Sequence, residues 1–235
     1  MKYDAIILSH PKDYNKISFC YESLSMLDPY PENIYLVTPD KFQIADAIPI
    51  SDCESIDVGV DEIVFSRPNW IYQQLIKLYQ KFSKNDIYMC VDSDVVFNRP
   101  IKFSGKTFFI SDRDQHHEPY FNFMKLYFAI EEPMDQTFIN DFMIFDKNIC
   151  SIMMPKAKQF VRDLNQYLSN DEYLFSEFET YGNFVNTHFA GRYSFRPTKV
   201  KTVGKHDVWS DQELQILKGL CSEMDIDLFT AHTWT

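Results

Sequence analysis

The amino-acid sequence predicts an α/β fold, with a central, mostly parallel mixed sheet flanked by helices in a Rossmann-like arrangement. Strand-like and helix-like segments alternate through the first half of the 235-residue chain, as in parallel sheets covered by helices on both faces. The segment 86–91 is apolar nearly throughout, as expected of a central strand buried on both faces. Hydrophobic residues make up 45% of the chain, enough for the core of one large domain. A single domain over residues 1–235 is therefore expected.

Six strands are predicted from short apolar runs that end at polar loops or turn signals. The second run, for example, stops at Pro39-Asp40. The predicted strands cover residues 4–9, 33–38, 61–65, 86–91, 106–111 and 141–146.

Five helices are predicted between and after these strands. In the second of them, Ile71, Leu75 and Leu78 recur at helical spacing, and Asn69 is the expected N-cap. Gly182 weakens the prediction of the fourth. The predicted helices cover residues 19–27, 69–82, 155–168, 176–189 and 211–220.

The charge of the chain limits its partners. The formal net charge is -11, so the protein repels polyanions and nucleic-acid binding is not expected. A nucleotide diphosphate would bind only where a metal ion or a few placed cationic side chains supply positive charge. The 21 Phe and 14 Tyr residues exceed what a core needs, and the surplus suits stacking against sugar rings or a base.

Cysteine usage and hydropathy indicate a cytoplasmic protein. The number of cysteines is odd, no pair has zinc or redox spacing, and reduced, buried thiols are expected. The N-terminus lacks the apolar run of a signal peptide. No stretch approaches the roughly 20 apolar residues needed to span a bilayer, and peripheral association with a membrane stays open. The cysteines are Cys20, Cys53, Cys90, Cys150 and Cys221.

The sharpest functional signal is Asp92-Ser93-Asp94, which directly follows the predicted central strand. Ligands of open α/β sheets bind beyond the carboxyl ends of strands. Carboxylates two residues apart in an extended chain lie roughly 6.6 Å apart, and they repel by about 2.5 kcal/mol at an effective dielectric near 20. Such a pair either stays in water as a solvated turn or holds a cation, and oxygen ligands suit Mg²⁺ or Mn²⁺.

A second enzyme class carries a similar motif. Haloacid-dehalogenase-type phosphatases also have an apolar strand followed by Asp-x-Asp-x-Val, which Asp94-Val95-Val96 fits. In that family the motif lies on the first strand and a later acidic pair adds metal ligands. Here three strand–helix units precede the motif and no later Asp-Asp follows, which argues against that reading.

Four segments together resemble the GT-A glycosyltransferases. They are SHPKD after the first strand, NIYLVTPD, a WxxQQxxK helix and VDSDVVF. The resemblance is closest to the bacterial and large-DNA-virus branch thought to build capsular or capsid glycans, and it covers roughly residues 3–234. It implies a GT-A fold, a nucleoside-diphosphate sugar as donor, in that family's usage a UDP-sugar, and Mn²⁺ or Mg²⁺ as cofactor.

The resemblance also implies roles for particular residues. Asp92 and Ser93 would lie at the donor, with Asp92 toward the ribose or metal, and Asp94 would be a direct metal ligand. Lys77 would share a helix face with two other donor-binding residues and supply positive charge, although the face could instead be solvated. The remaining donor-binding residues would be Ser9, His10 and Asp13 near the nucleoside, Thr38 and Asp40 beside the base, and Trp70 and Gln74 on the helix face.

Many GT-A enzymes complete the metal site with a histidine near the C-terminus. His232 and His206 are the available residues, and an imidazole is compatible with Mn²⁺. The location of His232 in the tail favours it as the third metal ligand over His206. Both residues could equally be structural.

Acidic residues downstream are the candidates for catalysis. An inverting enzyme needs a general base for the acceptor hydroxyl, whereas a retaining one needs a group near the anomeric centre. Glu177 and Glu179 are the first candidates and Asp141 is the next. Residues two apart on a helix point about 200° away from each other, so only one of the two Glu residues is expected to face a cleft. His116 and His117 are expected in a loop.

The predicted reaction is transfer of a hexosyl or deoxyhexosyl group to a hydroxyl of a glycan or glycoconjugate, with retention favoured over inversion. Residues 1–111 would bind the donor, and the less regular residues 112–235 the acceptor. A sugar nucleotidyltransferase is the first alternative, but its Gly-rich phosphate loop is missing from residues 4–16. The non-enzymatic alternative is an inactive glycan-binding domain, against which the intact Asp-Ser-Asp argues.

Overall fold

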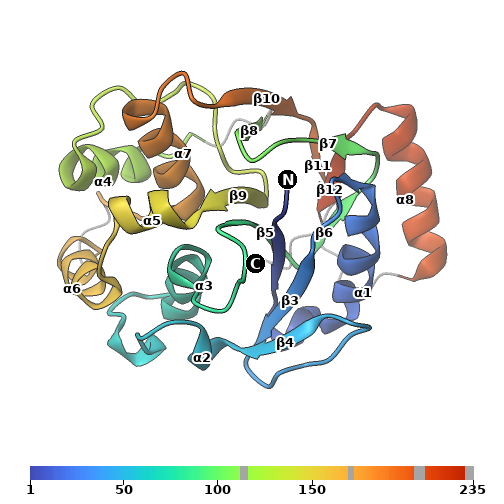
Figure 1. Ribbon diagram of the computed structural model, residues 1–235, viewed down its shortest axis with the longest axis horizontal. Helices are drawn as coiled ribbons and strands as arrows, with labels where there is room; N and C mark the ends of the chain where they lie inside the picture. The colour runs from blue at the N-terminus through green and yellow to red at the C-terminus, as the bar shows by residue number, and fades with distance from the viewer. Residues whose placement is uncertain (112–115, 169–171, 204–209, 231–235) are drawn as a thin grey trace.

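The computed structural model describes residues 1–111, 116–168, 172–203 and 210–230 (Figure 1). At its centre is a five-stranded sheet with the order β4-β3-β1-β5-β9. The first four strands are parallel, and β9 runs antiparallel to β5. The predicted mostly parallel mixed sheet is therefore confirmed. Its strands are β1 (Asp4–Leu8), β3 (Asn33–Thr38), β4 (Ile48–Ser51), β5 (Ile87–Asp92) and β9 (Phe142–Asp146).

The strand order creates a switch point between β1 and β5. The chain goes outward from β1 to β3 and β4, and then returns to place β5 on the other side of β1. Leu8 pairs with Val37 on one side and with Asp92 on the other, so three carboxyl ends meet at one edge. Open α/β sheets bind ligands in the crevice at such a point.

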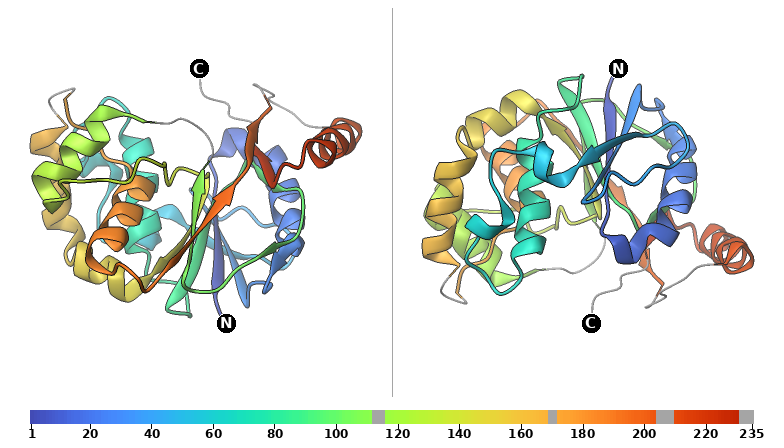
Figure 2. Two further views of the ribbon diagram at one scale, coloured as in Figure 1. Left: turned by 90° about the horizontal axis from the view of Figure 1, so that it is seen from above. Right: turned by 90° about the horizontal axis from the view of Figure 1, so that it is seen from below.

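Helices cover both faces of the sheet. Figures 1 and 2 show α1 and α8 on one side and α3 to α7 on the other. Along β5, Tyr88 and Cys90 enter the core beneath α3 to α7, while Met89 and Val91 enter the core beneath α1, because successive side chains of a strand point to opposite faces. The helices are α1 (Tyr14–Ser23), α2 (Asp52–Ser55), α3 (Pro68–Tyr79), α4 (Glu118–Phe128), α5 (Lys147–Met153), α6 (Ala157–Tyr167), α7 (Glu177–His188) and α8 (Asp211–Glu223).

Shorter elements extend the sheet edges and the loops. β8 and β10 form a parallel pair, and β12 joins β11 to β6. Thr230 in β12 pairs with Val95, one residue beyond the Asp-Ser-Asp segment. The shorter strands are β2 (Leu27–Asp28), β6 (Val95–Phe97), β7 (Ile101–Lys102), β8 (Thr107–Ser111), β10 (Ser194–Thr198), β11 (Val200–Thr202) and β12 (Leu228–Thr230), and the 3-10 helices are η1 (Pro11–Asp13), η2 (Leu24–Met26) and η3 (Val60–Glu62).

The predicted strand at 61–65 is wrong. The segment begins in η3, where the Glu62 carboxylate accepts a hydrogen bond from the Gly59 N–H at 3.0 Å. The Val64 N–H then donates to the Asn165 side chain at 2.8 Å. The Glu62 and Ile63 N–H groups bond to carbonyl oxygens of the 3-10 turn. These backbone groups are therefore not paired with another strand, and β4 forms the edge of the sheet instead.

Several other predictions need correction. The first helix begins at Tyr14 and ends at Ser23, earlier than predicted. The N-cap of α3 is Arg67 and not Asn69, because Pro68 lacks an N–H and fits the first turn. The predicted strand at 106–111 forms, but as β8 beside β10, outside the central sheet.

The loop predicted around His116 and His117 leads directly into α4, which the sequence analysis missed. All five cysteines are free, and four are buried as expected, whereas Cys53 is exposed. Of the helices described, none is both long and apolar enough to cross a membrane.

Candidate active site

A cavity of about 510 Å³ lies at the carboxyl ends of β1 and β5. All three residues of the Asp-Ser-Asp segment line it, together with the first turns of α3 and α7. Acidic side chains from four parts of the chain line the cavity, and cationic side chains line it as well. The acidic residues are Asp13, Asp92, Asp94, Asp141 and Glu177, and the cationic ones are Lys12, Arg67 and Lys77.

Lys77 bridges two of these carboxylates. Its Nζ lies 2.8 Å from Asp92 and 2.7 Å from Glu177. Lys77 and Glu177 are buried, whereas the Asp92 side chain keeps 37% of its surface exposed. The bridge therefore joins a buried carboxylate of α7 to a carboxylate that still has room for a further ligand.

The position of Lys77 is fixed from several sides. The Tyr88 hydroxyl donates to the Lys77 carbonyl oxygen at 2.7 Å, and the ammonium group lies 4.2 Å from the centre of the Phe178 ring. Burial alone would lower the pKa of Lys77, but Asp92 and Glu177 outweigh it and raise the pKa above its usual value. Lys77 is thus charged at neutral pH.

Burial raises the pKa of Glu177, the nearby Lys77 only partly opposes this, and the negative charge of Asp92 adds to the increase. A raised pKa makes the carboxylate a stronger base. Glu177 is the first residue of α7, and Ser176 is its N-cap, with a side chain that accepts from the Glu179 N–H. The cap fixes the start of the helix and so the direction in which Glu177 leaves it.

Glu179 does not line the cavity. Its carboxylate is buried and accepts hydrogen bonds from the Thr137 hydroxyl and the Phe138 N–H. Asn183 donates a third, longer bond at 3.4 Å. Burial raises the pKa of Glu179 to about 7. The position of Glu179 is that of a residue that anchors the loop before β9.

Asp141 reaches the cavity from that same loop. Its φ of 63° lies in the left-handed region, which costs a non-glycine residue free energy and is common at functional sites. The Asp141 carbonyl oxygen accepts from the Asp92 N–H at 3.0 Å. The backbone bond holds Asp141 beside the end of β5.

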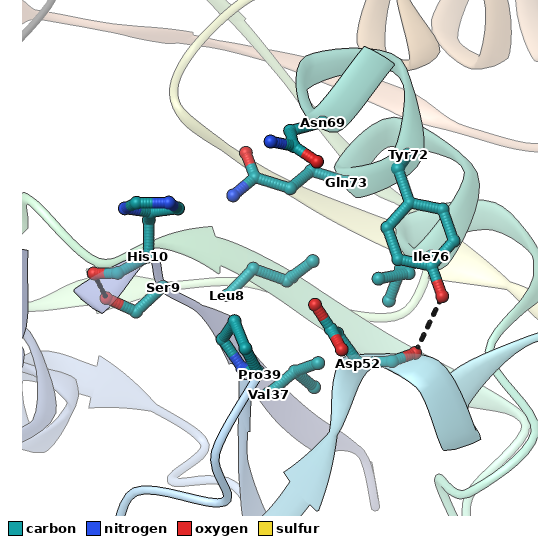
Figure 3. Close-up of a pocket in the computed structure, with 10 residues that line it drawn as sticks. All are labelled: Leu8, Ser9, His10, Val37, Pro39, Asp52, Asn69, Tyr72, Gln73 and Ile76. Atoms are coloured by element: carbon teal, nitrogen blue, oxygen red, sulfur yellow. Dashed lines mark hydrogen bonds between the residues drawn. The ribbon is translucent and has the colours of Figure 1, made fainter. Parts of the chain in front are cut away.

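A smaller cavity of about 250 Å³ adjoins the first (Figure 3). Leu8, His10, Asn69 and Gln73 line both cavities. In Figure 3, His10, Asn69 and Gln73 lie on one side, and Val37, Pro39 and Asp52 lie on the other. The Tyr72 hydroxyl closes one end by donating to the Asp52 carbonyl oxygen at 3.0 Å. The two cavities thus lie side by side at the sheet edge and form a two-part site.

Most of the predicted donor-binding residues line one of the two cavities. Thr38 and Asp40 line neither, although Val37 and Pro39 beside them line the smaller one. The Thr38 hydroxyl accepts from the Phe42 N–H at 2.8 Å, and the Asp40 carboxylate accepts from the Tyr14 hydroxyl. The predicted residues that line the cavities are Ser9, His10, Asp13, Trp70, Gln74, Lys77, Asp92 and Ser93.

The donor set at the sheet edge fits a hard divalent cation. Within residues 1–111, 116–168, 172–203 and 210–230, no three His, Cys, Asp or Glu side chains meet closely enough to hold an ion by themselves. Asp92 and Asp94 nevertheless line one cavity, and Mg²⁺ is often held by one or two carboxylates plus water and substrate phosphates. The proposed ligand His232, and the alternative His206, lie outside the described residues.

Several residues that line the site were not predicted from the sequence. Asn69 and Gln73 belong to the helix face that already carried predicted residues, so extending the helical spacing would have found them. Arg67, whose guanidinium lies 4.6 Å from the centre of the Trp70 ring, precedes that helix. Tyr120 carried no signal, because α4 was not predicted.

Comparison with known proteins places the chain in a family. A family model described as "Family of unknown function (DUF6492)" matches residues 12–219. The chain belongs to the DUF6492 family. No curated protein matches this DUF6492 chain.

Solved structures share the general arrangement of the DUF6492 chain. Mouse xyloside xylosyltransferase 1 is 7% identical, with 99% of this chain and 98% of that one covered and a TM-score of 0.46. The WbbM bifunctional glycosyltransferase is 11% identical, with 96% and 45% covered and a TM-score of 0.46. A glycosyltransferase involved in glycosylation of the major capsid of PBCV-1 is 15% identical, with 100% and 95% covered and a TM-score of 0.45. At this level of identity and overlap the likeness carries nothing about activity.

Proposed function

We propose that this protein is a metal-dependent glycosyltransferase that uses a nucleoside-diphosphate sugar. The observation that carries the proposal is the two-part site. An acidic cavity with Asp92 and Asp94 at the switch point adjoins a smaller cavity. The smaller cavity would take the nucleoside, and the larger one the diphosphate and the sugar.

Asp92 and Asp94 would hold Mn²⁺ or Mg²⁺ together with water and phosphate oxygens. When bound, the ion neutralises the charge that develops on the leaving diphosphate. The protein contributes to ion binding by holding the carboxylates of Asp92 and Asp94 at the sheet edge. Lys77 offsets the charge of Asp92 and Glu177, which would lessen the repulsion of an anionic donor.

In the proposed reaction the bond between the anomeric carbon and the diphosphate oxygen breaks, and its electron pair leaves with the diphosphate. The acceptor hydroxyl oxygen forms the new bond to the anomeric carbon. Its proton goes to Glu177 if the configuration inverts, or to the leaving phosphate oxygen if it is retained. In the retaining case, which we favour, Glu177 would lie by the anomeric centre, with Asp141 as the second candidate for either role.

The finer assignments extend the proposal. UDP is the proposed nucleotide, and the acceptor is a hydroxyl of a glycan or glycoconjugate. Both the polysaccharide and the protein-linked glycans built by similar enzymes remain candidate products.

The test is release of UDP from UDP-sugars in the presence of Mn²⁺, measured by coupled assay. Asp94→Ala should abolish release, and the free protein should keep its melting temperature or gain slightly, because a carboxylate is removed from an acidic cavity. Glu177→Gln keeps the size of the side chain and should reduce the rate by about 10²-fold or more if Glu177 is the general base. Normal turnover by Asp94→Ala would overturn the metal assignment. Formation of UTP and a sugar 1-phosphate from the UDP-sugar and added pyrophosphate, without release of UDP, would indicate a nucleotidyltransferase.

A further inference from the structure

The side-chain amide of Gln74 is buried, and only its oxygen has a hydrogen-bond partner among the described residues. The residue is 2% exposed and lies on α3, between Trp70 and Lys77 on the face that lines the larger cavity. Its Oε1 accepts from the Glu177 N–H at 3.0 Å. Only the carbonyl end of an amide can accept that bond, so the orientation of the Gln74 side chain is fixed.

The amide nitrogen of Gln74 therefore faces away from Glu177 N–H. In the described part of the chain, Gln74 Nε2 has no hydrogen-bond acceptor. A buried donor without an acceptor destabilises the fold, and native proteins nearly always avoid this. Since the residue lines a cavity, the missing acceptor is expected from whatever occupies the cavity.

The surroundings of Gln74 favour a neutral acceptor over a phosphate. The charge of Lys77, one turn along α3, is already matched by Asp92 and Glu177. Trp70 and Phe178 add aromatic surface to the same cavity, and such rings suit the apolar faces of sugars. An amide donor beside a carboxylate and aromatic rings is suited to a sugar hydroxyl.

We infer that Gln74 Nε2 donates a hydrogen bond to a hydroxyl of the transferred sugar and so selects a hexosyl donor over the analogue that lacks this hydroxyl. The inference rests on the proposed function and deepens it. A site built to bond a hydroxyl rejects the deoxy analogue strongly, because its own buried group is left unpaired.

Gln80, the residue that directly follows α3, provides a matched control. Its Oε1 accepts from the Ser83 N–H at 2.9 Å, and its buried Nε2 likewise has no acceptor among the described residues. Gln80 lines neither cavity. Replacing it removes the same kind of group away from the site.

The experiment uses the full chain with Mn²⁺ and the fastest-hydrolysed member of UDP-glucose, UDP-galactose and UDP-N-acetylglucosamine. Its mono-deoxy analogues are then compared by kcat/KM. Wild type should reject one analogue by about 10²-fold or more. Gln74→Met should reduce this preference to about threefold or less and leave the Kd of UDP with Mn²⁺ within about twofold, and Gln80→Met should keep the wild-type preference.

Gln74→Glu provides the second variant, because it retains an acceptor for the Glu177 N–H and replaces the amide donor with a charged carboxylate oxygen. A carboxylate can still accept from the sugar hydroxyl, so the preference of Gln74→Glu should fall between those of wild type and Gln74→Met. The inference would be overturned if both variants kept the full preference for the hydroxyl-bearing donor. It would also be overturned if the variants bound UDP as weakly as they bind the UDP-sugar. In either case, donor use by the wild-type protein would leave the proposed function standing. If wild type neither binds nor hydrolyses any of these donors, the proposed function fails and the inference with it.

Discussion

Replacing Lys77 tests directly how the charges of the site stabilise one another. It is buried against Asp92 and Glu177, and breaking a buried pair by removing one partner leaves an uncompensated charge. Lys77→Met should therefore lower the free energy of unfolding by about 3 kcal/mol or more. Glu177→Gln introduced into that variant should restore part of the loss, as measured by urea unfolding at pH 7. Equal stability of the single and double variants would show that the two residues are not coupled.

Glu179 gives a pH dependence of stability. Its pKa is raised to about 7 in the folded protein, mainly by burial, from 4.5. Between these values the folded state holds a proton that the unfolded state releases, so stability falls as the pH rises through about 4.5 to 7 and is constant above. The loss amounts to at most about 3 kcal/mol. Glu179→Gln should flatten this slope in urea unfolding at pH 5 and pH 8.

The matched control for Glu179 is Glu223→Gln, since Glu223 is exposed at the end of α8. A slope that persists in Glu179→Gln would assign the pH dependence to another group.

The sequence predicted that only one of the two carboxylates of α7, Glu177 or Glu179, would face a cleft, and it could not say which. That depends on where α7 lies against α3, which only the packing of the two helices decides.

At the scale of elements, replacing two helical glycines with alanine is expected to change the free energy of unfolding in opposite directions. A Cβ at Gly182 in α7 would overlap the Phe138 ring, whereas one at Gly219 in α8 would meet nothing within 4 Å. Gly182→Ala should lower the free energy of unfolding by about 1–3 kcal/mol through overpacking. Gly219→Ala should raise it by about 0.5–1 kcal/mol, because alanine loses less backbone entropy in a helix. A stabilising Gly182→Ala would show that Phe138 can move aside.

The sequence predicted those elements that have a strong local pattern and missed those that depend on distant partners. Strong periodicity predicted α3, α6 and α7 to within a few residues, even though Gly182 weakened α7, since its close approach to Phe138 is a tertiary requirement. β4 was missed because IPIS is short and contains a proline. The segment 61–65 resembled a strand locally, but Asn165, about 100 residues away, takes its backbone bond. Long-range partners of this kind leave no local signal.

At the scale of the whole molecule, the sheet order and the net charge act together. The order 3-2-1-4 of the parallel strands, read in sequence, places the ends of β1 and β5 side by side. The sequence predicts the site at the Asp-Ser-Asp segment, which begins at the last residue of β5. The net charge of -11 attracts divalent cations and repels a nucleotide diphosphate over the whole surface. Binding of the nucleotide is therefore expected to depend on the ion.

This dependence is measurable as a shift in melting temperature. UDP with Mn²⁺ at about 100 times the Kd should stabilise the protein by about 2.7 kcal/mol, which corresponds to roughly 5–10 °C for a chain of this size. UDP alone should give a much smaller shift, because no ion then offsets the carboxylates of Asp92 and Asp94. Asp94→Ala should reduce the shift with Mn²⁺ to that of UDP alone, while Glu223→Gln should leave it unchanged. An equal shift in EDTA would mean that the cationic side chains Lys12, Arg67 and Lys77 suffice for the diphosphate, and that the acidic pair serves another purpose.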